Sequence, residues 1–219
     1  MTIQDSFEIF IEGQTLRLLP EKALFWENEK CLIISDVHLG KAGHFRKNGI
    51  ALPQSSHDED LRVIDILIQN WEPKWIIFLG DLFHSGKNVE WQSFKKWRIS
   101  HSTVEMHLVL GNHEIYPEEE YSILGVNCFH QYLAEPFIFI HDEEMVNASD
   151  MIFTISGHIH PAIRMKGIGR QSLRIPCFYI EKSKAFLPAF GSLTGTQTIK
   201  LSRKAQVFGV LENQILQIQ

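Results

Sequence analysis

Short apolar runs separated by polar turns dominate the chain. Between residues 7 and 27 the pattern predicts two or three short strands, in the segments FEIFIEG, TLRLL and ALFWEN. Later runs have the length of buried strands: CLIIS (31–35), WIIFL (75–79), MHLVL (106–110), PFIFI (136–140), MIFTI (151–155), PCFYI (176–180) and QVFGV (206–210). The chain is therefore rich in strands that have little polar surface.

Two segments carry a helical repeat instead. Ser56 and Glu59 have capping-box spacing, and apolar residues then recur at helical intervals up to Trp71. A second helix is predicted to start near Asn88, with one face formed by Trp91, Phe94 and Trp97. This spacing favours packing in a core over stacking on nucleic-acid bases. Early strands separated by helices, followed by strands with few helices, predict a layered sheet sandwich flanked by helices.

Composition narrows the class of protein. The 219 residues fit one domain, 1–219, and 44% are apolar against 21% charged, as in globular proteins. The net charge of −5 excludes a generally basic nucleic-acid coat, but not a local anion site. No apolar run reaches the roughly 18 residues of a membrane span. No secretory signal is expected at the start, and three scattered cysteines without a C-x-x-C pair favour a reduced, cytoplasmic setting: Cys31, Cys128 and Cys177.

Five of the apolar runs are followed by residues of the types that commonly bind metals in proteins. In order along the chain these are Asp36 and His38, then Asp81 and His84, then Asn112, His113 and Glu114, then His141 and Asp142, and finally His158 and His160. Sites gather at strand ends in layered α/β sheets. Glycines precede Asp81, Asn112 and His158, and they allow tight turns and close backbone approach. Each motif alone is weak, and His141 alone fits a core or turn histidine; the ordered set predicts a metal site.

The number of ligands suggests two metal ions. Alternate residues of an extended segment point to the same side, so Asp36 and His38 can reach one cation, and His158 and His160 repeat that spacing. We expect the first ion to be held by Asp36, His38, Asp81 and His160. We expect the second to be held by Asp81, Asn112, His141 and His158, with Asp81 shared. Nitrogen and oxygen ligands without thiolate suit manganese, iron or zinc without choosing among them, and manganese is our first expectation.

The series D-V-H-L-G, G-D-L-F-H, G-N-H-E, His141 and G-H-I-H resembles the calcineurin-like metallophosphoesterase superfamily over residues 31–161. The resemblance implies an α/β fold of four layers, a β-sandwich flanked by helices, with a dinuclear site at the strand ends. It implies a metal-dependent phosphoesterase. Two ions would clamp a phosphate and turn a bridging water into hydroxide at neutral pH, for in-line attack on phosphorus.

A narrower resemblance runs over nearly the whole chain. The segments from LLPEKALFWENEK through GHIHPAIRMKG to LPAFGSLTG are similar to bacterial DNA-ligase-associated metallophosphoesterases. This implies a phosphodiesterase or nuclease that acts on DNA in repair, beside a ligase and a helicase. Val37 and Glu114 depart from the usual leucine and aspartate of that group, and neither departure removes a ligand.

Several residues are candidates for contacts with substrate. His113 lies next to Asn112 and is our choice to protonate the leaving oxygen. The resemblance implies that His84 contacts the substrate phosphate, with a turn residue as the alternative. Three cations are candidates for gripping a longer phosphate chain, with ordinary solvated surface as the alternative: Lys41, Arg46 and Arg164. His44 is expected to be a surface loop residue.

Two other functions stay open on the sequence. The same motifs serve a hydrolase of small nucleotides or phosphomonoesters, because the metals and the water act alike on both substrates. A partner-binding scaffold that no longer catalyses is disfavoured, because the chain keeps the whole ligand set. A homodimer that would suit a two-stranded substrate is also an open expectation, since apolar edge strands need cover.

Overall fold

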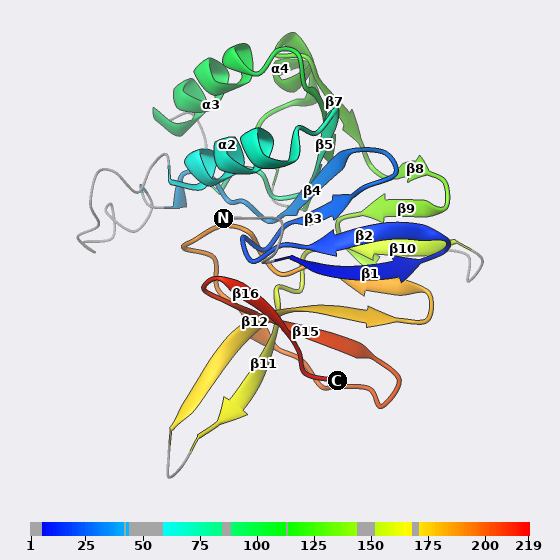
Figure 1. Cartoon of the computed structure of the whole chain (residues 1–219). Helices are drawn as coiled ribbons and strands as arrows, with labels where there is room; N and C mark the ends of the chain where they lie inside the picture. The colour runs from blue at the N-terminus through cyan, green and yellow to red at the C-terminus, as the bar shows by residue number, and fades with distance from the viewer. Residues whose placement is uncertain are drawn as a thin grey trace.

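The apolar runs form two β-sheets in the computed structural model of the chain (Figure 1). It describes residues 6–41, 43, 59–84, 89–112, 114–143, 152–167 and 171–219. In this described part the first sheet has strands in chain order: β1 (Phe7–Ile11), β2 (Gln14–Leu18), β3 (Leu24–Trp26), β4 (Cys31–Ser35), β5 (Trp75–Leu79), β6 (Glu105–Val109) and β7 (Val126–Phe129). Strands β1 to β4 pair antiparallel, and β4 to β7 pair parallel.

The second sheet is built from the later part of the chain. Its strands are β8 (Tyr132–Ala134), β9 (Phe137–Ile140), β10 (Phe153–Ser156), β11 (Pro161–Lys166), β12 (Ser172–Glu181), β13 (Lys184–Phe186), β14 (Gln197–Thr198), β15 (Gln206–Leu211) and β16 (Gln214–Gln217). They are ordered β14-β11-β12-β13-β10-β9-β8, and β15 joins β12 to β16. Strands β9, β10 and β13 run parallel, while β11 and β12 form an antiparallel hairpin.

Three described helices cover the first sheet: α2 (Glu59–Trp71), α3 (Val89–Ser100) and α4 (Glu118–Ile123). Their apolar residues share one core with the outward faces of β4, β5 and β6. Trp91 and Trp97 are buried in that core, which confirms packing over base stacking. Both predicted helices are found, although Ser56 of the expected capping box lies outside the described residues. No helix among the described residues is long and apolar enough to cross a bilayer.

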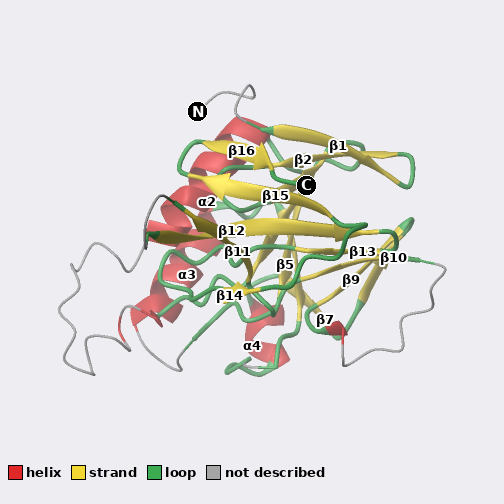
Figure 2. Cartoon of the chain, turned by 90° about the horizontal axis from the view of Figure 1, so that it is seen from below, coloured by secondary structure: helices red, strands yellow, loops and turns green. Residues whose placement is uncertain are grey.

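The two sheets meet face to face through a second core. Residues such as Ile33, Ile77 and Phe178 fill it, and Figure 2 shows the second sheet in front of the helices. On the outer face of the second sheet a third core packs Cys177 and Tyr179 against residues near Ala205. The two sheets and the helical flank confirm the predicted fold class, and all three cysteines are free as expected. That residues 1–219 form one domain stays a prediction.

Candidate metal centre

Parallel pairing brings the predicted ligand segments to one edge of the sandwich. The carboxyl ends of β4, β5 and β6 lie side by side in the first sheet, and those of β9 and β10 do so in the second. Backbone hydrogen bonds continue between the loops that follow β4 and β5. His38 N donates to Asp81 O at 2.9 Å, and Leu39 N donates to Leu82 O at 2.8 Å. Segments far apart in sequence thus supply one site.

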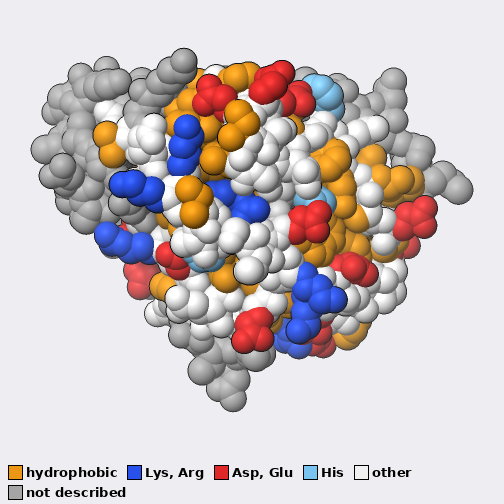
Figure 3. All heavy atoms as spheres, turned by 90° about the horizontal axis from the view of Figure 1, so that it is seen from above, with side chains coloured by type: hydrophobic (Ala, Val, Ile, Leu, Met, Phe, Trp, Pro, Cys, Tyr) orange, Lys and Arg blue, Asp and Glu red, His pale blue; other side chains and the backbone are white. Residues whose placement is uncertain are grey.

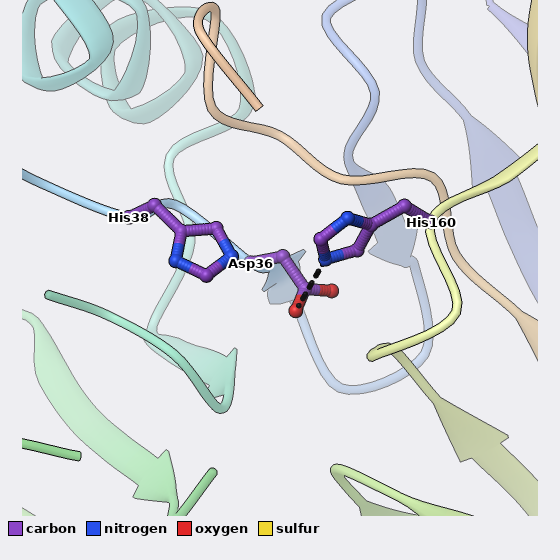
Figure 4. Close-up of side chains that lie close together, drawn as sticks. All are labelled: Asp36, His38 and His160. Atoms are coloured by element: carbon purple, nitrogen blue, oxygen red, sulfur yellow. Dashed lines mark ion pairs between the residues drawn. The ribbon is translucent and has the colours of Figure 1, made fainter. Parts of the chain in front are cut away.

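One group of possible ligands joins the first sheet to the second. Asp36, His38 and His160 each offer an atom, and these atoms lie within 4.8 Å of one another. His160 points toward the Asp36 carboxylate, with Nε2 3.1 Å from Oδ1 (Figure 4). Asp36 and His38 follow β4, whereas His160 follows β10. The cluster therefore bridges the two sheets.

A second group shares Asp36 with the first and adds Asp81 and His141. Asp81 lies between two histidines, with Oδ2 3.8 Å from His38 Nε2 and Oδ1 3.6 Å from His141 Nε2. His158 is next to this group, with Nδ1 3.2 Å from His141 Nε2. One carboxylate oxygen of Asp81 thus faces each group, an arrangement that suits a bridging ligand.

The backbone at these positions is unusual for residues other than glycine. Five of the predicted ligands have φ in the left-handed region, with values of 52° at Asp36, 52° at His38, 47° at Asp81, 65° at His158 and 47° at His160. Such residues cost of order 1–3 kcal/mol each and gather at functional sites. The strand ends are held in a conformation that local preference does not favour.

Glycines make the close approach possible. A Cβ at Gly111 would overlap Asp81 Oδ1, and a Cβ at Gly157 would overlap Ser35 Oγ and lie 2.6 Å from Asp36 Oδ2. Any side chain at these two positions would therefore displace a carboxylate of the site. This confirms the close backbone approach predicted for the glycines before Asn112 and His158.

Backbone carbonyls orient two of the histidines. His141 Nδ1 lies 3.0 Å from Leu79 O, and His160 Nδ1 lies 3.1 Å from Gly195 O. A carbonyl only accepts, so a neutral imidazole at either position carries its proton on Nδ1 and leaves the lone pair of Nε2 for a metal ion. Metal-binding histidines are commonly fixed in this way by an outer hydrogen bond.

Buried polar atoms without hydrogen bonds show that the site fits metal ions. Among the described residues, Asp36 Oδ1, both ring nitrogens of His38, and His160 Nε2 are buried and have no hydrogen-bond partner. The other Asp36 oxygen is satisfied, because Ser35 Oγ and His158 N both donate to Oδ2, the latter at 3.0 Å. Buried unsatisfied groups are costly, and a cation removes the cost. Three of these atoms belong to the residues that could bind one ion: Asp36 Oδ1, one ring nitrogen of His38, and His160 Nε2.

Protonation states also suit metal binding. Burial lowers the pKa of His38 to about 3, so its imidazole is neutral at neutral pH. Burial alone would raise the pKa of Asp36, but His160, His141 and Ser35 hold this pKa below its ordinary value. Metal ligands must be neutral imidazoles or ionised carboxylates.

A cavity of 360 Å³ opens over the cluster. Its lining comprises His38, Lys41, Asp81, His84, Ile115, His158 and His160. Burial lowers the pKa of Lys41, while Asp36 and Asp81 oppose this shift. His84 lies beside the first group, with its ring centroid 5.6 Å from that of His38. Lys41 and His84 thus line the cavity beside the first group of possible ligands.

The remaining predicted residues fall into three cases. Asn112 is exposed and follows Gly111, which contacts Asp81. Arg164 lies on the β11–β12 hairpin and does not line the cavity. Three other residues with a predicted role lie outside the described residues: His113, Arg46 and His44.

One residue of the site gave no signal in the sequence, and two others followed the apolar runs without an assigned role: Asp142 and Glu114. Ser35 closes its strand and appears in no motif, yet it holds Asp36. Asp142 Oδ2 lies 3.5 Å from His158 Nε2. Glu114, whose role was left open, accepts hydrogen bonds from Leu82 N at 3.2 Å and Tyr121 Oη at 2.9 Å, and burial raises its pKa. It ties the loop after β5 to the loop after β6.

Carboxylates and imidazoles gathered at the strand ends of a two-sheet sandwich define a metal-dependent hydrolase. The family model described as Calcineurin-like phosphoesterase matches residues 30–193, and the chain belongs to this family. It is therefore a metal-dependent phosphoesterase. No protein of curated function matches the chain.

Two solved structures are similar to it. The nuclease MPE of Pseudomonas putida superposes with a TM-score of 0.76 at 24% identity, covering 97% of this chain and 100% of that one. A conserved uncharacterized protein of Streptococcus pneumoniae TIGR4, titled a predicted phosphoesterase, gives a TM-score of 0.36 at 14% identity over 86% of this chain and 95% of that one. The first likeness shows the fold.

Proposed function

We propose that the protein is a phosphodiesterase that hydrolyses nucleic acid, with DNA as its substrate, at a centre of two divalent ions. The observation that carries the proposal is the cluster at the strand ends. Buried atoms of Asp36, His38 and His160 that could bind a metal have no hydrogen bond, and they lie beside an open cavity that Lys41 lines. A site with bound cations and an open cavity can accept a phosphodiester within a longer chain.

The proposed donor sets overlap the two groups of side chains, but they share Asp81 where the groups share Asp36, and they add Asn112 and His158. Asp36, His38, Asp81 and His160 would hold one ion. Asp81, Asn112, His141 and His158 would hold the other, and the Asp81 carboxylate, which faces both groups, would be shared. Manganese, iron or zinc suits these donors, and manganese is the first choice. Two bound ions supply Lewis acidity and a water of lowered pKa.

The chain's own residues would orient the phosphate and move protons. Lys41 and His84 face the cavity and would contact the non-bridging oxygens. His113 would give a proton to the leaving oxygen, a role that rests on its place beside Asn112 in the sequence. Carbonyl oxygens at Leu79 and Gly195 would keep His141 and His160 in their metal-binding tautomers.

Two lines support nucleic acid as the substrate. The Pseudomonas putida protein of the same fold is named as a nuclease. The resemblance to the DNA-ligase-associated group covers both ends of the chain. A role in DNA repair, association with a ligase and a helicase, a cytoplasmic location and a homodimer all stay predictions.

Profiling metals against substrates tests the proposal. Purified protein with manganese, zinc or iron is assayed on bis-p-nitrophenyl phosphate, on the mono-ester, and on labelled single- and double-stranded DNA. We expect metal-stimulated cleavage of the diester and of DNA, and loss of both in Asp81→Asn. Hydrolysis of the mono-ester or of free nucleotides with intact DNA would contradict the proposal and favour a small-molecule hydrolase.

A further inference from the structure

The hairpin of β11 and β12 extends away from the body of the molecule (Figure 1). It begins at Pro161, directly after His160 of the metal centre, and its two strands pair antiparallel from Ala162 with Pro176 to Lys166 with Ser172. Beyond Ile163 on β11 the described residues are exposed. The hairpin therefore presents a two-stranded ribbon that starts at the cavity.

This ribbon has a charge opposite to that of the whole chain. The net charge of the protein is −5, yet residues 161–180 contain arginine and lysine and no aspartate or glutamate. Arg164, Lys166 and Arg174 are exposed, and none of them forms an ion pair within the described part of the chain. On the helical face, by contrast, acidic and basic side chains are both present (Figure 3).

Two of these cations oppose each other directly. Arg164 and Arg174 are cross-strand partners, so their side chains share a face of the ribbon. Their nearest polar contacts are neutral, Ser172 Oγ at 3.0 Å for Arg164 and Thr196 O at 3.5 Å for Arg174. Like charges directly opposite are destabilising in a sheet. An anion placed between them would remove that cost, and the described residues pair neither arginine with a carboxylate.

The basic face lies on the same side of β12 as the core between the two sheets. Arg174 alternates in phase with Phe178 and Ile180, which belong to the core between the two sheets, while Ile175 and Cys177 face the outer core. Lys166 is two residues from Arg164 and shares its face. At roughly 3.3 Å per residue, Arg164 lies about 13 Å and Lys166 about 20 Å along the strand from His160. Those lengths span several nucleotides.

We propose that the β11–β12 ribbon is an arm that binds the phosphate backbone of the nucleic-acid substrate, several nucleotides away from the bond that is cut. The inference rests on the proposed function, since it extends that site along the same substrate. Arg164, Lys166 and Arg174 would each contact phosphate and carry no sequence preference. The arm explains how a chain of net negative charge would hold a polyanion.

Binding in an inactive background tests the arm without cleavage. The triple variant Arg164→Gln, Lys166→Gln, Arg174→Gln is made in Asp81→Asn protein, which leaves the probe intact. The matched control removes the same charge at exposed lysines elsewhere: Lys30→Gln, Lys74→Gln and Lys96→Gln. Affinity for a labelled single strand and for its duplex is measured from 50 to 200 mM salt, together with thermal unfolding and sedimentation.

We expect the arm variant to bind at least about 10-fold more weakly than the control at low salt. The slope of log affinity against log salt should fall by roughly 2–3, because each lost phosphate contact removes just under one unit. Both variants should keep the melting temperature of the parent. The control should keep its affinity to within about twofold.

Three results would overturn the arm. Equal affinity and salt slope in the arm and control variants would place the phosphate contacts elsewhere. Absence of binding by the parent to either probe would leave the arm without a ligand. A dimer that dissociates only in the arm variant would show that the cations contact a second copy of the chain. Binding that depends on the arm, in a protein whose active form leaves DNA intact, would instead refute the nuclease and keep the arm.

Discussion

The body of each central strand and the residues just past its end differ sharply. In β4, Ile33 is fully buried in the apolar core between the sheets. Three residues later Asp36 is equally buried, but it is charged, has a φ of 52° and leaves one oxygen without a hydrogen bond. Ile77 in β5 is likewise buried and apolar, whereas Asp81 beyond the strand is buried, carries a carboxyl group and has a φ of 47°.

Residues in the strand bodies stabilise the fold, whereas residues at the strand ends are kept in place by it. The strand bodies satisfy packing, hydrogen bonding and backbone preference together. The strand ends violate several of these rules at once, and they persist because the surrounding sheets fix them. Changes at the ends should therefore remove activity without unfolding the protein, and changes in the bodies should do the reverse.

The largest expected effect is from Asp81→Asn. The substitution keeps the shape of the side chain but removes the charge that faces both groups of ligands. We expect the rate of diester hydrolysis to fall by roughly 10³-fold or more, since electrostatic stabilisation and positioning of the phosphate are both lost. The melting temperature of the metal-free protein should stay equal or rise. A folded variant with normal turnover would contradict the role of Asp81.

Phe178→Ala makes the opposite change in a strand body. Phe178 is 1% exposed in the core between the sheets, so the cavity left behind should lower the free energy of unfolding by about 3–5 kcal/mol. Urea unfolding measures the loss. Turnover per folded molecule at a permissive temperature should stay near that of the parent. A fall as large as that in Asp81→Asn would show that the strand body also determines activity.

Acid should destabilise the metal-free protein through His38. Its pKa is lowered by burial from 6.5 to about 3, so between these values the unfolded chain binds the proton and the folded chain does not. The free energy of unfolding therefore falls as pH drops below 6.5, by roughly 3 kcal/mol from this group at pH 4. The lowered pKa of Asp36 acts in the same direction at lower pH.

Urea unfolding at several pH values, with and without His38→Gln, isolates this contribution. The variant should lose stability less steeply between pH 6.5 and 4 than the parent does. Parallel curves for the two proteins would show that folded His38 takes a proton as readily as the unfolded residue.

The smallest effect comes from a single methyl group. Gly157→Ala places a Cβ against Ser35 Oγ and Asp36 Oδ2, so the carboxylate must move and turnover should fall about 10²-fold. Gly167→Ala is the matched control when both variants are assayed on the small diester, which does not extend along the β11–β12 ribbon, because its Cβ would meet only Gln171 at an ordinary 3.5 Å. Similar activity in the two variants would mean that the site tolerates displacement of Asp36.

Buried strands were predictable from sequence, and several half-exposed strands were not. The runs 31–35 and 75–79 match β4 and β5 in full, because continuous apolar stretches have few alternatives to a buried strand. Strands such as β7 and β16, with the half-exposed sequences VNCF and QILQ, form because a neighbour supplies the hydrogen bonds. Strand β11 and the exposed first residues of β12 were missed for the same reason, and the short helix α4 was also missed.

The side chains of the site were predictable, and their supports were not. Six predicted ligands come together from four segments, because strand order and parallel pairing follow from the fold: Asp36, His38, Asp81, His141, His158 and His160. The carbonyls of Leu79 and Gly195 carry no signature in the sequence, since every residue has one. The loop of Glu114 depends on tertiary contacts with Tyr121 that spacing does not indicate.

Anomalous scattering from crystals grown with manganese tests the two-ion centre most directly. We expect two anomalous peaks per chain, one on either side of the Asp81 carboxylate. One should be bound by Asp36, His38 and His160, and the other by His141 and His158. A single peak, or peaks away from Asp81, would contradict it.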